Sequence, residues 1–80
     1  MFPIGIDWAE KHLDYCITNN SGDVIKRGRV DNNDLGFNSL LQLFEKEKID
    51  FSEIAVAIES PHQRVVDFLI ARGVSVYPVR

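Results

Sequence analysis

Residues 2–18 read FPIGIDWAEKHLDYCIT, and this stretch decides the fold. Its first part, residues 2–6, is a short apolar run that ends at Asp7. Its second part, residues 13–18, alternates apolar and polar side chains with the period of two that is typical of a half-buried strand. The stretch therefore predicts two strands, joined by a polar loop over residues 8–12.

A turn signal and a third strand follow. Residues 19–23 read NNSGD, and these side chains tolerate positive φ and bond readily to the nearby backbone. The chain should turn there into a strand over residues 24–30. The first thirty residues thus predict an antiparallel meander of three strands.

A helix and a buried strand come next. The polar residues 31–34 offer several N-cap candidates, and apolar side chains then recur at helical spacing, which predicts a helix over residues 34–48. Residues 54–58 read IAVAI, a continuously apolar run typical of a strand covered on both faces in the middle of a sheet.

The last two elements are a capped helix and an edge strand. Residues 60–63 read SPHQ, a Ser N-cap with Pro at the first helical position and Gln at the third, and Gly73 supplies a stop. A final strand is expected over residues 74–79. The predicted order is therefore β-β-β-α-β-α-β.

This order predicts an α/β fold of the RNase H-like type. Because crossover connections are almost always right-handed, the five-stranded mixed sheet should have the order 3-2-1-4-5, with both helices on one face. The other face then needs a cover. We expect a helix that follows Arg80 in a longer chain or, failing that, a second copy of the protein in a homo-oligomer.

Composition narrows the function classes. With 80 residues, a net charge of −3 and 45% hydrophobic residues, the chain is one small globular domain or part of one, and its surface is not uniformly attractive to phosphate. Its single cysteine, Cys16, cannot form an internal disulfide, and no zinc-ligand spacing occurs. No secretory leader or membrane-spanning run is recognisable, so we expect a reducing, cytoplasmic location.

Two carboxylates point to a site. In the predicted topology Asp7 and Glu59 lie at the carboxyl ends of neighbouring parallel strands, where the sites of open α/β sheets gather. Paired carboxylates at that edge suit a hard cation, Mg²⁺ or Mn²⁺, which also binds water and phosphate oxygens. The structural alternative is that Asp7 merely ends a strand and Glu59 merely precedes a capped helix.

Three segments, GIDWAEKHLD (residues 5–14), NSGDV (20–24) and AIESP (57–61), resemble the amino-terminal DEDD domain of insertion-sequence transposases with a RuvC-like fold. The group includes the Piv-type DNA invertases. Four acids bind catalytic magnesium in this family, and by the resemblance Asp7 matches the first and Glu59 the second. The resemblance implies a parent enzyme that cleaves and transfers DNA phosphodiesters, guided in some members by an element-encoded RNA.

The resemblance also implies that this chain is a single, incomplete domain. The third and fourth acids have no counterpart, and the family's carboxy-terminal domain with its serine is absent. In the family those acids lie on the segment that would also cover the bare face of the sheet. We therefore expect the 80 residues to be inactive on their own.

Several further residues have two interpretations. Lys11 and His12, in the loop after the first strand, could contact phosphate or be solvated, and His62 could contact substrate or be merely exposed at a helix start. Asp14 could be another metal ligand or make a strand-face hydrogen bond. We expect Cys16 to be a small buried side chain.

The third predicted strand carries the only local group of basic residues, Lys26, Arg27 and Arg29. Because this strand lies at the edge of the sheet, these residues could prevent unwanted pairing with another strand or contact DNA. Trp8 could stack on a base or shield the loop against the core.

Other functions remain open at this point. The ATP-binding half of an actin-like or sugar-kinase-like protein begins with a similar pattern, but it needs glycine and hydroxyl residues after the aspartate, where this chain has Trp8-Ala9-Glu10. A Holliday-junction resolvase would share the fold and the metal logic. A non-catalytic assembly module would use the bare face as a permanent dimer interface.

Overall fold

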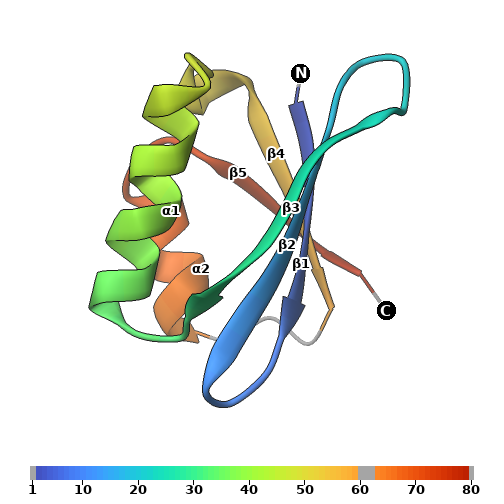
Figure 1. Ribbon diagram of the computed structural model, residues 1–80. Helices are drawn as coiled ribbons and strands as arrows, with labels where there is room; N and C mark the ends of the chain where they lie inside the picture. Colours follow the sequence, from blue (N-terminus) through green and yellow to red (C-terminus); the bar gives the residue numbers. More distant parts are fainter. Residues whose placement is uncertain (1, 60–62, 80) are drawn as a thin grey trace.

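The computed structural model describes residues 2–59 and 63–79. Within these ranges the elements are β1 (Phe2–Trp8), β2 (His12–Thr18), β3 (Val24–Asp31), α1 (Asp34–Lys46), the 3₁₀ turn η1 (Phe51–Glu53), β4 (Ile54–Glu59), α2 (Gln63–Ile70) and β5 (Ser75–Val79). The sheet has the order β3-β2-β1-β4-β5, antiparallel on the β3 side of β1 and parallel on the β4 side (Figure 1). The predicted topology is confirmed.

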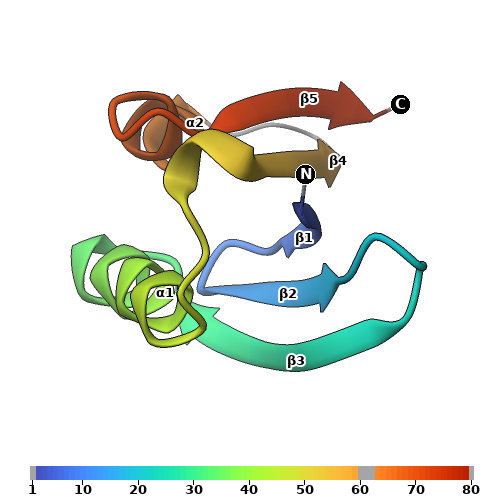
Figure 2. The same ribbon diagram turned by 90° about the horizontal axis from the view of Figure 1, so that it is seen from above.

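The molecule has two layers, with both helices on the same face of the sheet (Figure 2). Since side chains alternate across a strand, every second residue of β1, β2 and β4 points to the helices. The buried core consists of Ile4, Ile6, Leu13, Ile17, Phe37, Leu40, Phe44, Ile49, Ile54, Val56, Ile58, Val65, Leu69 and Val74. The rings of Phe37 and Phe68, with centroids 5.1 Å apart, join the two helices.

The opposite face of the sheet is bare in the described part of the chain. On β1 the residues that alternate with the core, Pro3, Gly5 and Asp7, are exposed, and on β4 Ala55 is half-buried and Ala57 exposed. The sequence predicted that β4 would be covered on both faces, and the described residues cover only one. The short side chains leave a low surface on which a further layer would fit closely.

Turn residues behave as the sequence predicts between β2 and β3. The Asn19 side-chain oxygen accepts hydrogen bonds from the backbone N–H groups of Ser21 (2.9 Å) and Asp23 (3.0 Å). Gly22 takes a φ of 85°, which a residue without a Cβ adopts at little cost. This hairpin places β3 at one edge of the sheet.

Helix α1 begins as expected but ends two residues early. Asn33 is its N-cap, and the Asn33 side chain accepts from the Gly36 N–H at 2.9 Å. The predicted end at Lys48 is wrong because Lys48 adopts a φ of 57°, and a Schellman motif closes the helix, with the Ile49 N–H donating to the Phe44 carbonyl at 3.0 Å. Ile49 is thereby buried in the core.

Helix α2 ends in the same way, at the glycine that the sequence marked as a stop. Gly73 has a φ of 87°, and the Val74 N–H donates to the Leu69 carbonyl at 3.1 Å. The predicted capping residues Ser60, Pro61 and His62 lie outside the described residues. Neither α1 nor α2, the helices of the described ranges, is long and apolar enough to cross a bilayer.

Lys48 occupies a backbone conformation that favours glycine, so Lys48→Gly should raise the free energy of unfolding by about 0.5–1 kcal/mol. The control is Lys46→Gly, an exposed change two residues earlier at the last residue of α1, which should lower it by about 0.5–1 kcal/mol. Urea unfolding of both variants measures the difference. Equal destabilisation by the two glycines would contradict the assigned helix end.

Candidate functional site

Four charged residues stand in one row across four strands. Asp7 on β1 is the Cα partner of Glu59 on β4 and also of Asp14 on β2, and Asp14 is the partner of Arg29 on β3. Directly opposed residues of neighbouring strands project from the same face of a sheet. All four line one open hollow, of about 760 Å³, on the bare face.

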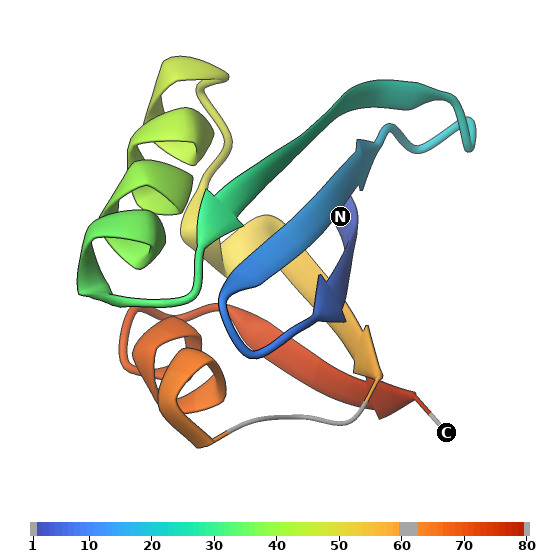
Figure 3. The same cartoon turned by 60° about the horizontal axis from the view of Figure 1, so that its bottom comes forward.

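Asp7 and Glu59 meet because β1 and β4 run in the same direction and end together. Figure 3 shows the arrowheads of the two strands at the same edge of the sheet. Both residues are exposed, and neighbouring strands lie about 4.8 Å apart. The register places the two carboxylates side by side, as the topology required, while their binding of metal stays a prediction.

Asp14 has an arginine as its partner. The Arg29 guanidinium donates two hydrogen bonds to the Asp14 carboxylate, from Nε to Oδ1 at 2.7 Å and from Nη2 to Oδ2 at 3.2 Å. This bidentate contact lowers the pKa of Asp14 from its ordinary value and raises the pKa of Arg29. The His12 Nε2 lies 4.0 Å from Asp14 Oδ2. Of the two interpretations of Asp14, the structure shows the strand-face hydrogen bond.

The donor atoms present fit a hard divalent cation. Asp7 and Glu59 offer carboxylate oxygens, the ligands that magnesium and manganese prefer. Across residues 2–59 and 63–79, no three side chains of His, Cys, Asp or Glu are grouped closely enough to hold a metal ion. The third acid of the row is instead bonded to Arg29. The described part therefore offers two carboxylates, and water or other oxygen ligands would complete the coordination.

Small residues make the floor of the hollow. Gly5 lies between Cys16 on β2 and Ala57 on β4, and a Cβ added at Gly5 would meet nothing within 4 Å. Cys16, which we expected to be buried, is half-buried because its side chain belongs to the bare face. The sequence indicated this floor, since the small residues Gly5 in β1 and Ala55 and Ala57 in β4 alternate with large apolar residues.

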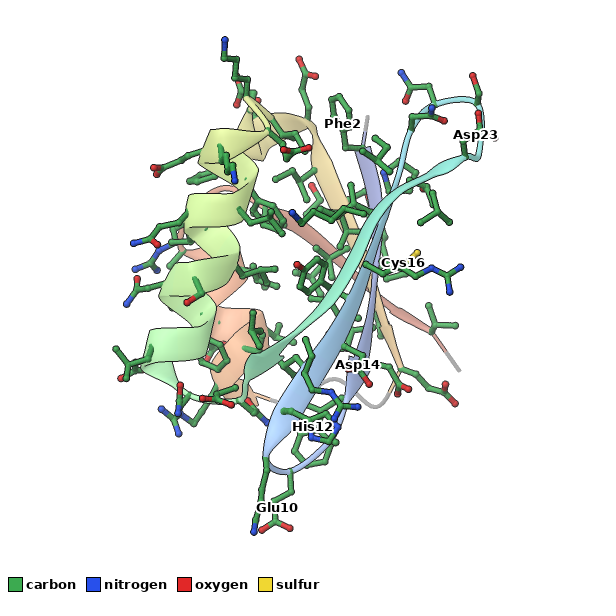
Figure 4. All side chains as sticks on the ribbon, in the orientation of Figure 1. Phe2, Glu10, His12, Asp14, Cys16 and Asp23 are labelled. Atoms are coloured by element: carbon green, nitrogen blue, oxygen red, sulfur yellow. The ribbon has the colours of Figure 1, made fainter. Side chains whose placement is uncertain are left out.

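Lys11 and His12 do not line the hollow in the described part of the chain. The loop that carries Lys11 is held by Asn32, whose side-chain N–H donates to the Ala9 carbonyl at 2.9 Å. Figure 4 shows Glu10 projecting from this loop away from Asp14. His62 lies outside the described residues, so a contact of these three predicted residues with nucleic acid is untested.

The remaining predicted residues divide between the two faces. Arg27 and Arg29 line the hollow, whereas Lys26, which alternates with them, does not. Trp8 is half-buried and packs against the core, in agreement with the shielding interpretation. Sequence analysis missed the Asp14–Arg29 pair, because only the register of β2 against β3 brings these two residues together.

Comparisons with known proteins identify a family and a relative with similar sequences. A family model described as a transposase, of the DEDD type of IS110, matches residues 4–80. The mini-circle transposase for IS117 from Streptomyces coelicolor is 38% identical over 63 residues, a match that covers 78% of this chain and 15% of that protein.

The fold also matches a solved structure. YeaZ from Pseudomonas aeruginosa superposes with a TM-score of 0.56 over 98% of this chain and 43% of YeaZ, at 15% sequence identity. At that identity the likeness concerns the fold alone.

The Asp14–Arg29 pair gives a testable pKa. Asp14 should titrate below its ordinary value of 3.8, so any stabilisation from the pair is present above pH 3.8 and is lost as the pH falls through the lower, folded-state pKa. In Arg29→Ala the pKa of Asp14 should return upward. Carboxyl ¹³C NMR measures both. Asp50 is the internal control, because hydrogen bonds from Ser52 lower its pKa and the substitution should not change it. An unchanged Asp14 pKa in Arg29→Ala would contradict the pairing.

Proposed function

The chain belongs to the DEDD family of IS110-type transposases, and on this premise we propose that Asp7 and Glu59 are the first two of the family's four metal-binding acids. In the full-length protein these acids bind the divalent cations, Mg²⁺ or Mn²⁺, with which DNA phosphodiesters are cleaved and transferred. The observation that carries the proposal is the register of β1 with β4, which pairs Asp7 with Glu59 at the carboxyl edge of the sheet.

The position of the two acids suits this chemistry. They stand on rigid, hydrogen-bonded strands, so their carboxylates are held in fixed relation before any ligand arrives. They face the bare side of the sheet, where an open hollow leaves room for a polynucleotide strand. An acid pair on the helix side would be enclosed by core side chains and closed to such a substrate.

The protein's own residues bind and orient in this mechanism. Asp7 and Glu59 would each supply carboxylate oxygens to the cation, and the small floor at Gly5 and Ala57 would let the strand approach. A bound divalent ion supplies activation of the attacking oxygen and stabilisation of the leaving oxygen. Asp14 is bonded to Arg29, so the guanidinium competes with a cation for the Asp14 oxygens, and the proposal assigns the ligand role to Asp7 and Glu59 alone.

We also propose that residues 1–80 form the first part of one RNase H-like domain. The chain spans 15% of the length of the Streptomyces coelicolor relative, and the family's third and fourth acids have no counterpart here. Those two acids would complete the site in the full-length protein. The 80 residues alone should therefore bind a cation weakly and cleave no DNA.

The ATP-binding alternative has little geometric support. A phosphate cradle needs backbone N–H groups that point to the ligand at the turn after the first strand. In that turn the Ala9 N–H donates to the His12 carbonyl at 3.0 Å, so it is already used within the loop. The side chains of Trp8 and Glu10 would add bulk and negative charge beside a phosphate.

Titration with Mn²⁺ followed by NMR tests the metal site. The backbone signals of Asp7 and Glu59 should broaden at cation concentrations on the order of 1 mM, as suits a site of few ligands. Asp7→Asn and Glu59→Gln should each abolish the broadening, since each removes one of two charged ligands. Asp23→Asn is the matched control: it removes a carboxylate from the turn at the far end of the β2–β3 hairpin (Figure 4). Broadening that follows Asp23, or none at millimolar Mn²⁺, would refute the site.

A further inference from the structure

The hollow holds two arginines that the metal site does not explain. Arg27 and Arg29 project from β3 onto the bare face and line the same hollow as Asp7 and Glu59. Arg29 is fixed in place by the two hydrogen bonds to Asp14, yet 61% of its side chain remains exposed. Within the described ranges its Nη1 atom has no hydrogen-bond partner. The guanidinium is thus oriented and still able to donate outward.

This orientation favours a phosphate contact over the other interpretation of the basic edge strand, the prevention of unwanted strand pairing. A charged side chain that only prevents strand pairing needs to be solvated at the edge, and this role does not require a fixed orientation of the side chain. Arg29 is instead bonded to Asp14 on the neighbouring strand β2, so its guanidinium is directed along the row toward Asp7 and not toward the open edge. A fixed guanidinium with free donors is the group that binds phosphate with defined geometry.

The charges of the hollow favour the same conclusion. Its lining carries three acids, Asp7, Asp14 and Glu59, and two bases, Arg27 and Arg29, a sum of −1. With a divalent cation bound the sum becomes +1, so a phosphate would be repelled before binding of the cation and attracted after it. The two arginines lie on the Asp14 side of the row, and among the described residues that line the hollow no basic side chain lies on the Glu59 side.

We propose that Arg29, oriented by Asp14, binds a backbone phosphate of the DNA strand whose scissile phosphodiester lies at Asp7 and Glu59. Arg29 stands two strands from Asp7, about 10 Å along the row, so it contacts a phosphate to one side of the scissile one and sets the path of the strand across the bare face. This inference rests on the proposed function, which supplies DNA as the substrate.

Arg64 provides a matched control. It is also an exposed arginine bonded to an aspartate, with Nη2 at 3.2 Å from Asp34 Oδ1. It lies in the first turn of α2, in the helix layer on the other side of the sheet from the hollow. Arg29→Ala and Arg64→Ala therefore remove the same charge from the same kind of ion pair, and only one of them is in the proposed DNA path.

Fluorescence anisotropy with a labelled DNA duplex in Mg²⁺, repeated over a series of salt concentrations, tests the proposal. Arg29→Ala should weaken binding and reduce the slope of log K against log salt by about 1, the contribution of one phosphate contact. Arg29→Lys should restore the slope because it keeps the charge, and Arg64→Ala should leave the slope unchanged. An unchanged slope in Arg29→Ala, an equal reduction in Arg64→Ala, or no Mg²⁺-dependent DNA binding by the unmodified protein would each overturn the inference.

Mn²⁺ broadening of Asp7 and Glu59, measured in Arg29→Ala, separates this inference from the proposed function. Retained broadening together with the reduced salt slope supports both. Retained broadening with an unchanged slope overturns the role of Arg29 and leaves the metal site standing. Absence of broadening in the unmodified protein refutes the metal site, and with it the inference that depends on it.

Discussion

The register of β1 is the constraint on which the structure depends. β1 pairs with β2 on one side and β4 on the other, and residues 4–7 pair in both ladders. Because side chains alternate, this register sends Ile4 and Ile6 into the core and Gly5 and Asp7 to the bare face. A slip by one residue would exchange the two sets, burying a carboxylate and exposing isoleucines. The hydrophobic core therefore holds the acid pair in place through the strands that both share.

The fold was predictable because independent signals agreed. Period-two alternation in β2, the turn residues around Gly22 and the glycine stop at Gly73 each fix one local structure, and right-handed crossovers leave one simple order for the strands. The position of Asp7 beside Glu59 followed from that strand order alone.

Two features could not be predicted, because only tertiary structure determines them. Lys48, two residues after the end of α1, adopts a conformation that its residue type does not favour, and burial of Ile49 stabilises this turn. The Asp14–Arg29 pair required the β2–β3 register, which a bulge after Ile17 does not shift at this end.

Charge compensation along the row distinguishes the acid pair, Asp7 and Glu59, from the ion pair, Asp14 and Arg29. Asp14 and Arg29 cancel, so the row presents an uncompensated charge of −2 at Asp7 and Glu59, equal and opposite to that of a divalent cation. If Arg29 were bonded to Asp7 instead, the guanidinium would compete with a cation for the same oxygens. The bond to Asp14 on β2 therefore fixes the positive charge of Arg29 near the acid pair without engaging the oxygens of that pair. Because β2 separates β3 from β1, Arg29 is compatible with a metal site at Asp7 and Glu59.

As proposed ligands, Asp7 and Glu59 would set a limit on what this part of the protein does. Magnesium demands near-octahedral geometry and gives up its bound waters reluctantly, so two carboxylates would fix the position of an ion but leave most of its coordination sphere to water and substrate. Catalysis requires that the attacking and leaving oxygens be in line, which needs further ligands to fix the orientation of that sphere. The bare face is where such ligands must approach, because the helices close the other one (Figure 2). The low floor at Gly5 and Ala57 gives them access close to the acids. These small side chains are therefore the feature of the sheet that links its packing to its chemistry, because they let a further layer or a substrate come close to the acids.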